Sequence, residues 1–328
     1  MNLVTAGTVS EVILIIADQD DVHSRHVKSL IETAGGAACI LDFARLAESA
    51  RFSHALGSRT DTGHLVSKES VDFAQVQTIW LRRPAMVAVP GAVTDDAART
   101  FVRHEWSAAI NGMAMSHDVR WVNHPFAQNA ASKPLQLHWA QKVGLPIPET
   151  LITNDPQLVR EFVRRHDDRV VHKALTDPGG RLIDTRAWDK SRDDAYLDAC
   201  LPIAPGIFQR HVQGRGDVRS AIIGSEVFSV FIDSRTSRST VDSRLDLDAA
   251  YTAHELPERT ACMLRELMAR LGLVFGVVDL KVDADGQHVF LEVNPQGQFL
   301  FMEILTRLPI SAAMANFLLS GTVSKAAG

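Results

Sequence analysis

Two carboxylates and an amide near the end of the chain have the types and spacing of a metal site. Asp279 lies in one apolar run, and Glu292 and Asn294 lie in a second one at 290–295. An Asp285-Gly286 turn would join the runs as a hairpin, so the three side chains should converge on one spot. Such oxygen ligands suit Mg²⁺, which usually also contacts phosphate oxygens. Carboxylates on a hairpin often form only its solvated face, but an unpaired Glu292 among apolar neighbours would be costly, which favours the ligand interpretation.

Two lysines upstream are candidates for binding phosphate as compact point charges. Lys133 lies at or near the start of an expected helix, and Lys173 ends an expected strand over 169–173. Each lysine taken alone would more commonly be a surface residue. Their phosphate role therefore depends on the whole set of candidate residues.

An extended segment is expected at 208–212, before a glycine-rich turn. The backbone groups of Gln209, His211 and Val212 are candidates for reading an adenine edge, and Asp217 is a candidate for holding ribose hydroxyls. Any hairpin with a glycine-rich turn looks similar, so this signal is weak by itself.

Competing motifs are incomplete. Arg219 stands where a dinucleotide fingerprint beginning at Gly214-x-Gly216 needs its third glycine, and the chain has no P-loop sequence. His104-Glu105 and His254-Glu255 lack the later histidine of a zinc protease. The serine elbow of a hydrolase is also missing.

The elements expected to position these residues fall into two regions with different patterns of strands and helices. Apolar strands at 12–17, 38–41 and 76–81, with a helix over 22–34, predict a parallel sheet. Helices are expected over 94–115, capped by Thr94, and over 127–143. From 149 onward, closely spaced strands predict a mixed body. The fold class is thus α/β followed by α+β.

Composition agrees with a soluble multidomain enzyme. The 328 residues suggest about two domains, and 34 Lys plus Arg against 39 Asp plus Glu leave a net charge of −5. No bulk charge favours nucleic acid or an anionic membrane as a partner. The longest apolar run near the N-terminus is far shorter than the roughly 20 residues of a membrane span. Three separated cysteines and no secretory signal pattern lead us to expect a cytoplasmic protein.

Taken together, these residues resemble the ATP-grasp superfamily of carboxylate–amine ligases over about residues 123–320. A closer similarity rests on Trp80-Leu81-Arg82-Arg83-Pro84, Val122-Asn123-His124-Pro125, residues 144–154, Asp217-Val218-Arg219, Asp242-Ser243-Arg244 and residues 292–298. Through these stretches the chain is most similar to the ribosomal-peptide maturases that make microviridins and related graspetides. Arg210 and Ser243 depart from the family pattern, which often has an acidic and an aromatic residue there.

The resemblance implies an ATP-grasp fold behind a small pre-ATP-grasp domain. The expected boundaries are 1–122 for that domain, 123–205 for a central subdomain and 206–328 for a C-terminal subdomain with the metal site. ATP and Mg²⁺ are the implied cofactors. The implied partner is a precursor peptide with leader and core, and the implied assembly is a homodimer.

The implied reaction activates an Asp or Glu side chain of that peptide as an acyl phosphate and closes an amide or ester ring. Arg219 and Arg244 are candidates for steering the acyl phosphate or a peptide carboxylate, because a guanidinium fork fits either one. Ordinary salt bridges with Asp217 or Asp242 are the alternative for these arginines. The 177–180 loop is a candidate lid.

Three other functions stay open at this point. The first is a ligase with the same ATP chemistry that adds free amino acids to a protein tail or joins a dipeptide. The second is a nucleotide-binding regulator without catalysis. The third is a purely structural α/β scaffold.

Overall fold

The chain forms two compact units in the computed structural model, which describes residues 11–57, 62–66, 70–176, 186–233 and 250–320. The first unit comprises Met1–Pro125 together with Pro309–Gly328, and the second comprises Phe126–Leu308. The three-part division with boundaries after residues 122 and 205 stays a prediction.

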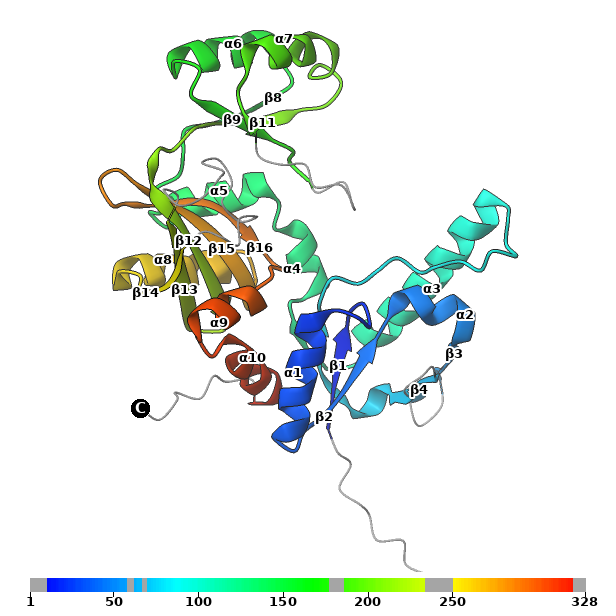
Figure 1. The fold of residues 1–328 in the computed structure, drawn as a ribbon. Coiled ribbons are helices and arrows are strands. Elements are labelled where there is room, and N and C mark those ends of the chain that lie inside the picture. Colours follow the sequence, from blue (N-terminus) through cyan, green and yellow to red (C-terminus); the bar gives the residue numbers. More distant parts are fainter. Residues whose placement is uncertain (1–10, 58–61, 67–69, 177–185, 234–249, 321–328) are drawn as a thin grey trace, which may run out of the picture. The chain divides into compact units, whose positions relative to one another are not determined.

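The first unit is built on a parallel sheet, as predicted. Its strand order is β2-β1-β6-β7, and every neighbouring pair is parallel. Helix α1 (Val22–Thr33) connects the first two strands (Figure 1). The strands are β1 (Val12–Ile16), β2 (Ala37–Leu41), β6 (Val76–Leu81) and β7 (Arg120–Val122).

One core of this unit lies between the sheet and helix α3 (Asp96–Ser116). Leu14 and Ile16 of β1 pack in one cluster with Ile110 and Met113 of α3. The predicted cap Thr94 is wrong, because the carboxylate of Asp95 accepts from the amide of Ala98 at 2.7 Å and caps the helix. The smaller elements are α2 (Leu46–Ser49) and the antiparallel strands β3 (Arg51–Ala55), β4 (Thr62–Val66) and β5 (Ser70–Asp72), with short 3₁₀ turns at Phe43–Arg45 and Phe73–Gln75.

The last helix, α10 (Ile310–Ser320), belongs to this first unit and packs against α1 (Figure 1). Arg120 of β7 donates to the Leu318 carbonyl at 2.6 Å and to Thr78 Oγ1 at 3.0 Å. Its guanidinium carbon lies 5.3 Å from the ring centroid of Phe317. A cation at the carboxyl end of a helix also complements the helix dipole, so Arg120 holds α10 on this unit.

The described part of the second unit contains two sheets. One is a four-stranded antiparallel sheet in the order β10-β9-β11-β8. Its helices bury Val159, Phe162 and Leu197 against Val170 and Phe208 of the strands. The elements are β8 (Thr150–Thr153), α6 (Pro156–Arg165), β9 (Val170–Lys173), β10 (Arg186–Ala187), α7 (Lys190–Ala199) and β11 (Gly206–Arg210).

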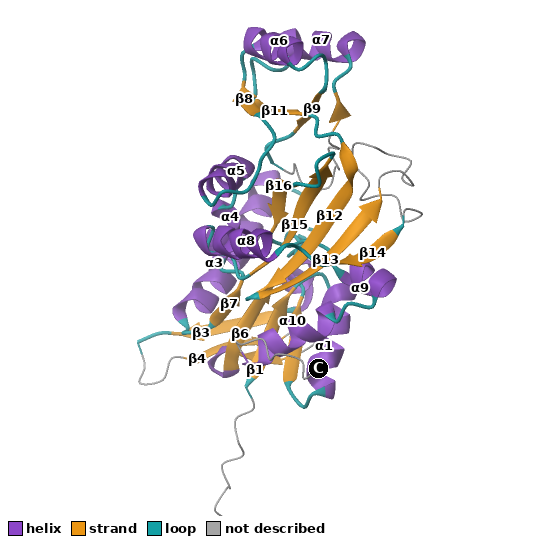
Figure 2. Cartoon of the chain, turned by 90° about the vertical axis from the view of Figure 1, so that its left-hand side faces the viewer, coloured by secondary structure: helices purple, strands orange, loops and turns teal. Residues whose placement is uncertain are grey.

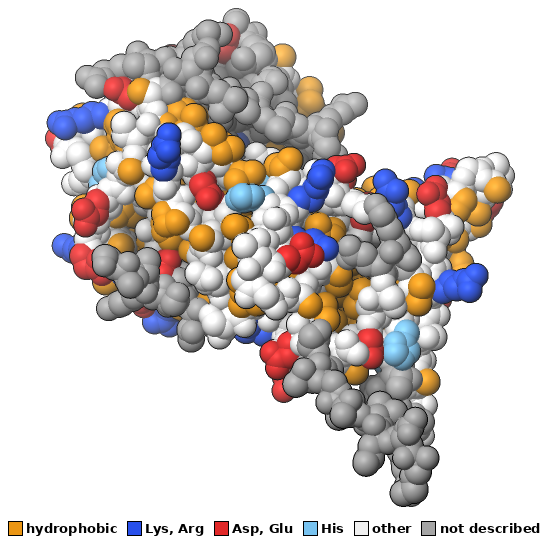
Figure 3. Space-filling view, turned by 60° about the horizontal axis from the view of Figure 1, so that its bottom comes forward, with side chains coloured by type: hydrophobic (Ala, Val, Ile, Leu, Met, Phe, Trp, Pro, Cys, Tyr) orange, Lys and Arg blue, Asp and Glu red, His pale blue; other side chains and the backbone are white. Residues whose placement is uncertain are grey.

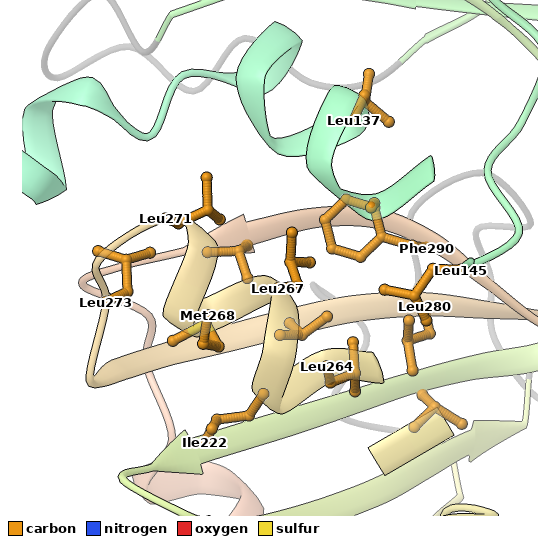
Figure 4. Packing of buried hydrophobic residues seen from close by; sticks show 14 of the residues in the cluster. Leu137, Leu145, Ile222, Leu264, Leu267, Met268, Leu271, Leu273, Leu280 and Phe290 are labelled. Carbon is orange, nitrogen blue, oxygen red and sulfur yellow. The ribbon is translucent and has the colours of Figure 1, made fainter. Parts of the chain in front are cut away.

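A five-stranded antiparallel sheet in the order β14-β13-β12-β15-β16 completes the second unit. Figure 2 shows α5 (Lys133–Lys142) and α8 (Glu258–Arg270) on one side of this sheet. In Figure 4, Leu264 and Met268 of α8 lie above the strands, close to Ile222 and Leu280. The remaining elements are α4 (Pro125–Ala130), β12 (Gly214–Ile223), β13 (Glu226–Asp233), β14 (Tyr251–His254), β15 (Phe275–Asp283), β16 (His288–Asn294) and α9 (Leu300–Thr306).

The single helix predicted over 127–143 is wrong, because the chain forms two helices, α4 and α5, there. Pro134 explains the break. A continuous helix would place its ring against the carbonyl of Ala130, and proline has no N–H to donate to that carbonyl. Lys133 consequently becomes the first residue of a new helix, as its predicted role requires.

Acidic and basic side chains are interspersed among the described residues visible in Figure 3. No helix in the described part of the chain is both long enough and apolar enough to cross a membrane.

A histidine pair joins the two edge strands of the five-stranded sheet. His254 ends β14 and His288 begins β16, and their Nε2 atoms lie 3.0 Å apart. The ring of His254 also lies 6.0 Å from that of Phe231. Burial lowers the pKa of both histidines below the ordinary 6.5, and the charge on a protonated His254 lowers that of His288 further.

We expect this pair to make the protein less stable in mild acid. As pH falls through about 6.5, the unfolded chain takes up protons that the folded pair resists, so the free energy of unfolding decreases by up to about 1.4 kcal/mol per pH unit for each proton. Urea unfolding between about pH 7.5 and pH 5.5 measures this slope. The double variant His254→Gln/His288→Gln should give a shallower slope, whereas His138→Gln, at an exposed position of α5, should not. Equal slopes for all three proteins would contradict the prediction.

Candidate active site

A pocket in the second unit is lined by both of its sheets. The four-stranded sheet contributes the ends of β9 and β11, and the five-stranded sheet contributes four strands. The lining residues are Pro148, Val171, Lys173, Gln209, Arg210, His211, Val212, Asp217, Val218, Arg219, Ile232, Asp279, Leu280, Lys281, Leu291 and Glu292.

The structure brings most of the predicted site residues to this pocket. Lys133 lies beside the pocket, where it forms an ion pair with Glu292. Asn294 follows two residues after Glu292 on β16. Arg244 and the 177–180 loop lie outside the described residues. The predicted residues that line the pocket are Lys173, Gln209, His211, Val212, Asp217, Arg219, Asp279 and Glu292.

Two ion pairs cross directly between neighbouring strands β12 and β15. Arg219 is paired with Asp279 in the strand register, and its Nη1 lies 2.7 Å from Asp279 Oδ1. Asp217 is paired with Lys281, and Oδ1 lies 2.9 Å from Nζ. Arg219, Asp279 and Lys281 are 7%, 8% and 5% exposed, so these charges depend on their partners for compensation. The expected alternative of a salt bridge between Arg219 and Asp217 is therefore wrong.

Glu292 completes a row of charges on the pocket wall. It is opposite Asp279 in the β15–β16 register, as the predicted hairpin requires. Lys133 Nζ lies 3.6 Å from Glu292 Oε2 and donates to the Ala174 carbonyl at 2.9 Å. Lys133 thereby links α5, the strand end at Lys173 and the carboxylate of β16.

A β-bulge next to Asp279 gives the hairpin its side-chain arrangement. Asp279 is opposite Glu292, but Leu280 is opposite Phe290, which leaves Leu291 as an extra residue in β16. The adjacent residues Leu291 and Glu292 both line the pocket. At the same time Leu280 and Phe290 stay fully buried in the core. The bulge therefore supports an ionic pocket wall and an apolar core on one hairpin.

Gln136 of α5 hydrogen-bonds the backbone of the edge strand β16 on the side where this strand has no neighbouring strand among the described residues. Its buried side-chain amide donates to the Val293 carbonyl at 2.9 Å and accepts from the Val293 amide at 2.8 Å. It also donates to the Ala131 carbonyl at 2.7 Å. Because Val293 follows Glu292, this clamp fixes the strand that carries the carboxylate.

The end of β11 and the two residues after it form another wall of the pocket. Gln209 is buried and donates to Thr150 Oγ1 at 3.0 Å, and the amides of Arg210 and His211 donate to backbone carbonyls at 2.9 Å each. Burial lowers the pKa of His211, the charge of Lys281 lowers it further, and Asp217 partly offsets both. His211 is therefore neutral near pH 7 and leaves this wall uncharged at its position.

Asp279 and Glu292 are the residues best suited to a divalent cation. Their oxygens are the hard donors that Mg²⁺ prefers, and both already face a cationic side chain. The side-chain oxygen of Asn294 accepts from the Gln296 amide at 2.9 Å, so its role as a ligand stays a prediction. The described residues contain no group of three or more His, Cys, Asp or Glu side chains placed for a metal ion, which leaves two carboxylates with further oxygen ligands as the fitting arrangement.

The sequence interpretation missed Lys281 and Gln136. Lys281 carries a signal that would have found it, because it lies two residues after Asp279 on one strand and therefore shares its face. Gln136 carries no such signal, since only the docking of α5 beside β16 shows what its amide binds.

Comparisons with solved structures cover nearly the whole chain. The RiPP-associated ATP-grasp ligase from Chryseobacterium gregarium, in complex with ADP and a leader and core peptide, gives a TM-score of 0.86 at 24% identity, over 95% of this chain and 97% of that chain. The macrocyclase MdnC from Microcystis aeruginosa MRC, bound with precursor peptide MdnA, gives 0.84 at 25% identity, over 94% and 99%. The ATP-grasp ligase PsnB, complexed with a phosphomimetic variant of minimal precursor, Mg and ADP, gives 0.75 at 23% identity, over 95% and 98%.

The chain has the ATP-grasp fold. The resemblance inferred from the sequence is confirmed, and so is the fold class of an ATP-grasp body behind a small parallel-sheet domain. No protein-family model matches the sequence, and no curated protein sequence is detectably similar to it. The ATP-grasp fold is therefore evident from the three-dimensional structure and from a few residues at characteristic spacings.

Breaking the Asp217–Lys281 pair from one side should destabilise the protein more than removing both charges. Lys281→Met removes the cation that lies 2.9 Å from the largely buried Asp217 carboxylate, which we expect to cost about 3 kcal/mol. Adding Asp217→Asn should recover most of that loss. Urea unfolding of the two single variants and the double variant measures the coupling, and strictly additive losses would contradict the pairing.

Removing the Gln136 clamp should loosen β16. Gln136→Leu leaves the N–H and C=O of Val293 unsatisfied, at a cost of about 2–4 kcal/mol in unfolding free energy. Hydrogen exchange at the Val293 amide should rise strongly in the same variant. Gln141→Leu, at an exposed position of the same helix, is the matched control and should change neither value. Unchanged exchange at Val293 in Gln136→Leu would contradict the clamp.

Proposed function

We propose that this protein is an ATP-dependent ligase that closes macrolactam or macrolactone rings in a ribosomal precursor peptide. The observation that carries the proposal is a pocket lined by Asp279, Glu292, Lys173 and Arg219, with Lys133 paired to Glu292 beside it, within an ATP-grasp fold. The peptide-bound ATP-grasp ligases that share this fold over almost their entire length support a peptide as the substrate.

The proposed reaction has two steps. A carboxylate oxygen of an Asp or Glu side chain in the peptide attacks the γ-phosphorus of ATP, the bond from that phosphorus to the β,γ-bridging oxygen breaks, and ADP leaves. An amine or hydroxyl of the same peptide then attacks the acyl carbon, loses its proton and displaces phosphate. Phosphoryl transfer needs positioning and charge neutralisation more than covalent help, which is what a pocket of fixed charges provides.

In this proposal the chain's own residues bind the nucleotide from three sides. Lys133 and Lys173 offset charge on the phosphates. The segment 209–212 at the end of β11 receives the adenine, and Asp217 receives the ribose hydroxyls. The neutral state of His211 suits an uncharged base beside it.

Asp279 and Glu292 are proposed to hold Mg²⁺, with Asn294 as a further ligand. When bound, Mg²⁺ supplies positive charge at the β- and γ-phosphates. The pairing of Asp279 with Arg219 and of Glu292 with Lys133 suits this role, since both carboxylates keep a cationic partner that also has affinity for phosphate.

Arg219 is proposed to bind the acyl phosphate or the peptide carboxylate that forms it. It lines the pocket, and its guanidinium keeps a positive charge beside the two candidate metal ligands, which suits an anionic ligand. Arg244 is proposed for the same task on the sequence pattern alone. The precursor would bind through leader and core, and a homodimer is the proposed assembly.

Intact-mass analysis of the precursor peptide tests the function. The protein is incubated with ATP, Mg²⁺ and the short peptide encoded beside its gene. We expect the peptide to lose one water for each ring, with one ADP formed per ring. A mass gain equal to an added amino acid would instead assign a tailing ligase, and binding of ADP without any peptide-dependent ADP release would assign a regulator.

Removing either candidate metal ligand should stop ring closure while the fold persists. Asp279→Asn and Glu292→Gln each remove a negative charge from the cation site, and we expect at least about a hundredfold lower turnover. Asp285→Asn, on an exposed turn of the same hairpin, should keep its activity. Circular dichroism checks that each variant is folded, and near-normal turnover of a folded Asp279→Asn protein would overturn the metal assignment.

A further inference from the structure

An aromatic ring lies against the guanidinium of Arg219. The Cζ atom of Arg219 lies 5.6 Å from the ring centroid of Phe301, the second residue of helix α9. The Phe301 ring in turn meets Tyr251 of β14 edge-on, with centroids 6.0 Å apart and planes at 81°. A cation over an aromatic face is attracted by the ring quadrupole, and more strongly where water is excluded, as it is around Arg219.

The other contacts of Arg219 leave its orientation incompletely determined. Nη1 holds Asp279 at 2.7 Å, whereas Nη2 reaches the Gln298 carbonyl only at 3.4 Å. One strong hydrogen bond fixes a point of the guanidinium but not its plane. The Phe301 ring, whose centroid lies 5.6 Å from Cζ, adds a second contact that limits how the guanidinium can turn about that hydrogen bond.

Other residues anchor α9 itself. Phe299 and Met302 are fully buried, and Phe299 packs edge-on against Phe275 with centroids 5.8 Å apart. Phe301 is only half-buried. Buried Phe299 and Met302 therefore anchor α9, while the Phe301 ring is left to contact Tyr251 and Arg219.

We propose that Phe301 is a positioning residue that holds the Arg219 guanidinium in the orientation needed to bind the acyl phosphate. This inference rests on the proposed function and deepens it. Loss of the ring leaves Arg219 paired with Asp279 but free to turn its plane. The activated peptide is then held less well, and water competes with the peptide's own nucleophile for the acyl carbon.

The test compares Phe301→Leu with Phe301→Tyr. We expect Phe301→Leu to lower kcat/KM for ring formation about 5- to 30-fold, from the usual strength of a desolvated cation–π contact. It should also raise the number of ADP molecules formed per ring closed. Phe301→Tyr keeps the aromatic face and should stay within about threefold of the natural protein. A purely structural role would lower the amount of folded protein without changing ADP per ring.

Phe317→Leu is the matched control. In the first unit, outside the nucleotide pocket, the Phe317 ring makes a comparable contact with Arg120. Its centroid lies 5.3 Å from the guanidinium carbon. The Phe317→Leu variant should lose stability but keep the natural ratio of ADP to rings. A folded Phe301→Leu protein with the natural ratio and natural kcat/KM would overturn the inference.

An NMR measurement separates this inference from the proposed function. In the ADP-bound protein, the Arg219 Nε–H signal should show a ring-current shift that Phe301→Leu removes and Phe301→Tyr keeps. A natural protein that closes no rings would refute the proposed function, and with it the catalytic part of the inference. An Arg219 signal unchanged in Phe301→Leu would refute the positioning itself, whatever the peptide does.

Discussion

Opposite charges that face each other across β12 and β15 are the constraint on which the pocket depends. Buried Arg219, Asp279 and Lys281 stay charged only while each has its partner, and a slip of one residue between the two strands would turn the charges of one strand away from those of the other. Pairing therefore fixes the register. The register in turn places Asp279 opposite Glu292 and so brings both carboxylates to one pocket wall.

The sheet edge needs separate support, because β16 has a neighbour on one side only. Helix α5 supplies it twice, through the Gln136 amide on the Val293 backbone and through Lys133 on Glu292. Both contacts come from the helix that begins where Pro134 breaks the preceding one. The backbone restriction at Pro134 thus places Lys133 at the start of α5, beside the pocket, where it is proposed to bind phosphate.

Apolar patterning and turn residues predicted the main elements, whereas helix ends and side-chain partners were predicted less well. The parallel sheet and the hairpin around Asp285-Gly286 depend on local apolar patterning and turn chemistry, and both were predicted. The cap at Asp95 was missed because adjacent Thr94 is also a good capping residue, and the helix break was missed because the helical spacing continues through Pro134. The Arg219 partner was missed because Asp217 and Asp242 were considered as partners, and only the strand register selects Asp279.

By itself, the sequence determined the kinds of groups in the site and their order along the chain, because chemistry and period-two alternation can be read from residue types and spacing. It also indicated the ATP-grasp class through Lys133, Lys173 and Glu292-x-Asn294. Only the tertiary structure decided which charges meet, that Gln136 completes an edge strand, and that Phe301 lies over Arg219. These contacts join segments that are 60 to 157 residues apart in the sequence, and their energies depend on burial and distance, which no local pattern specifies.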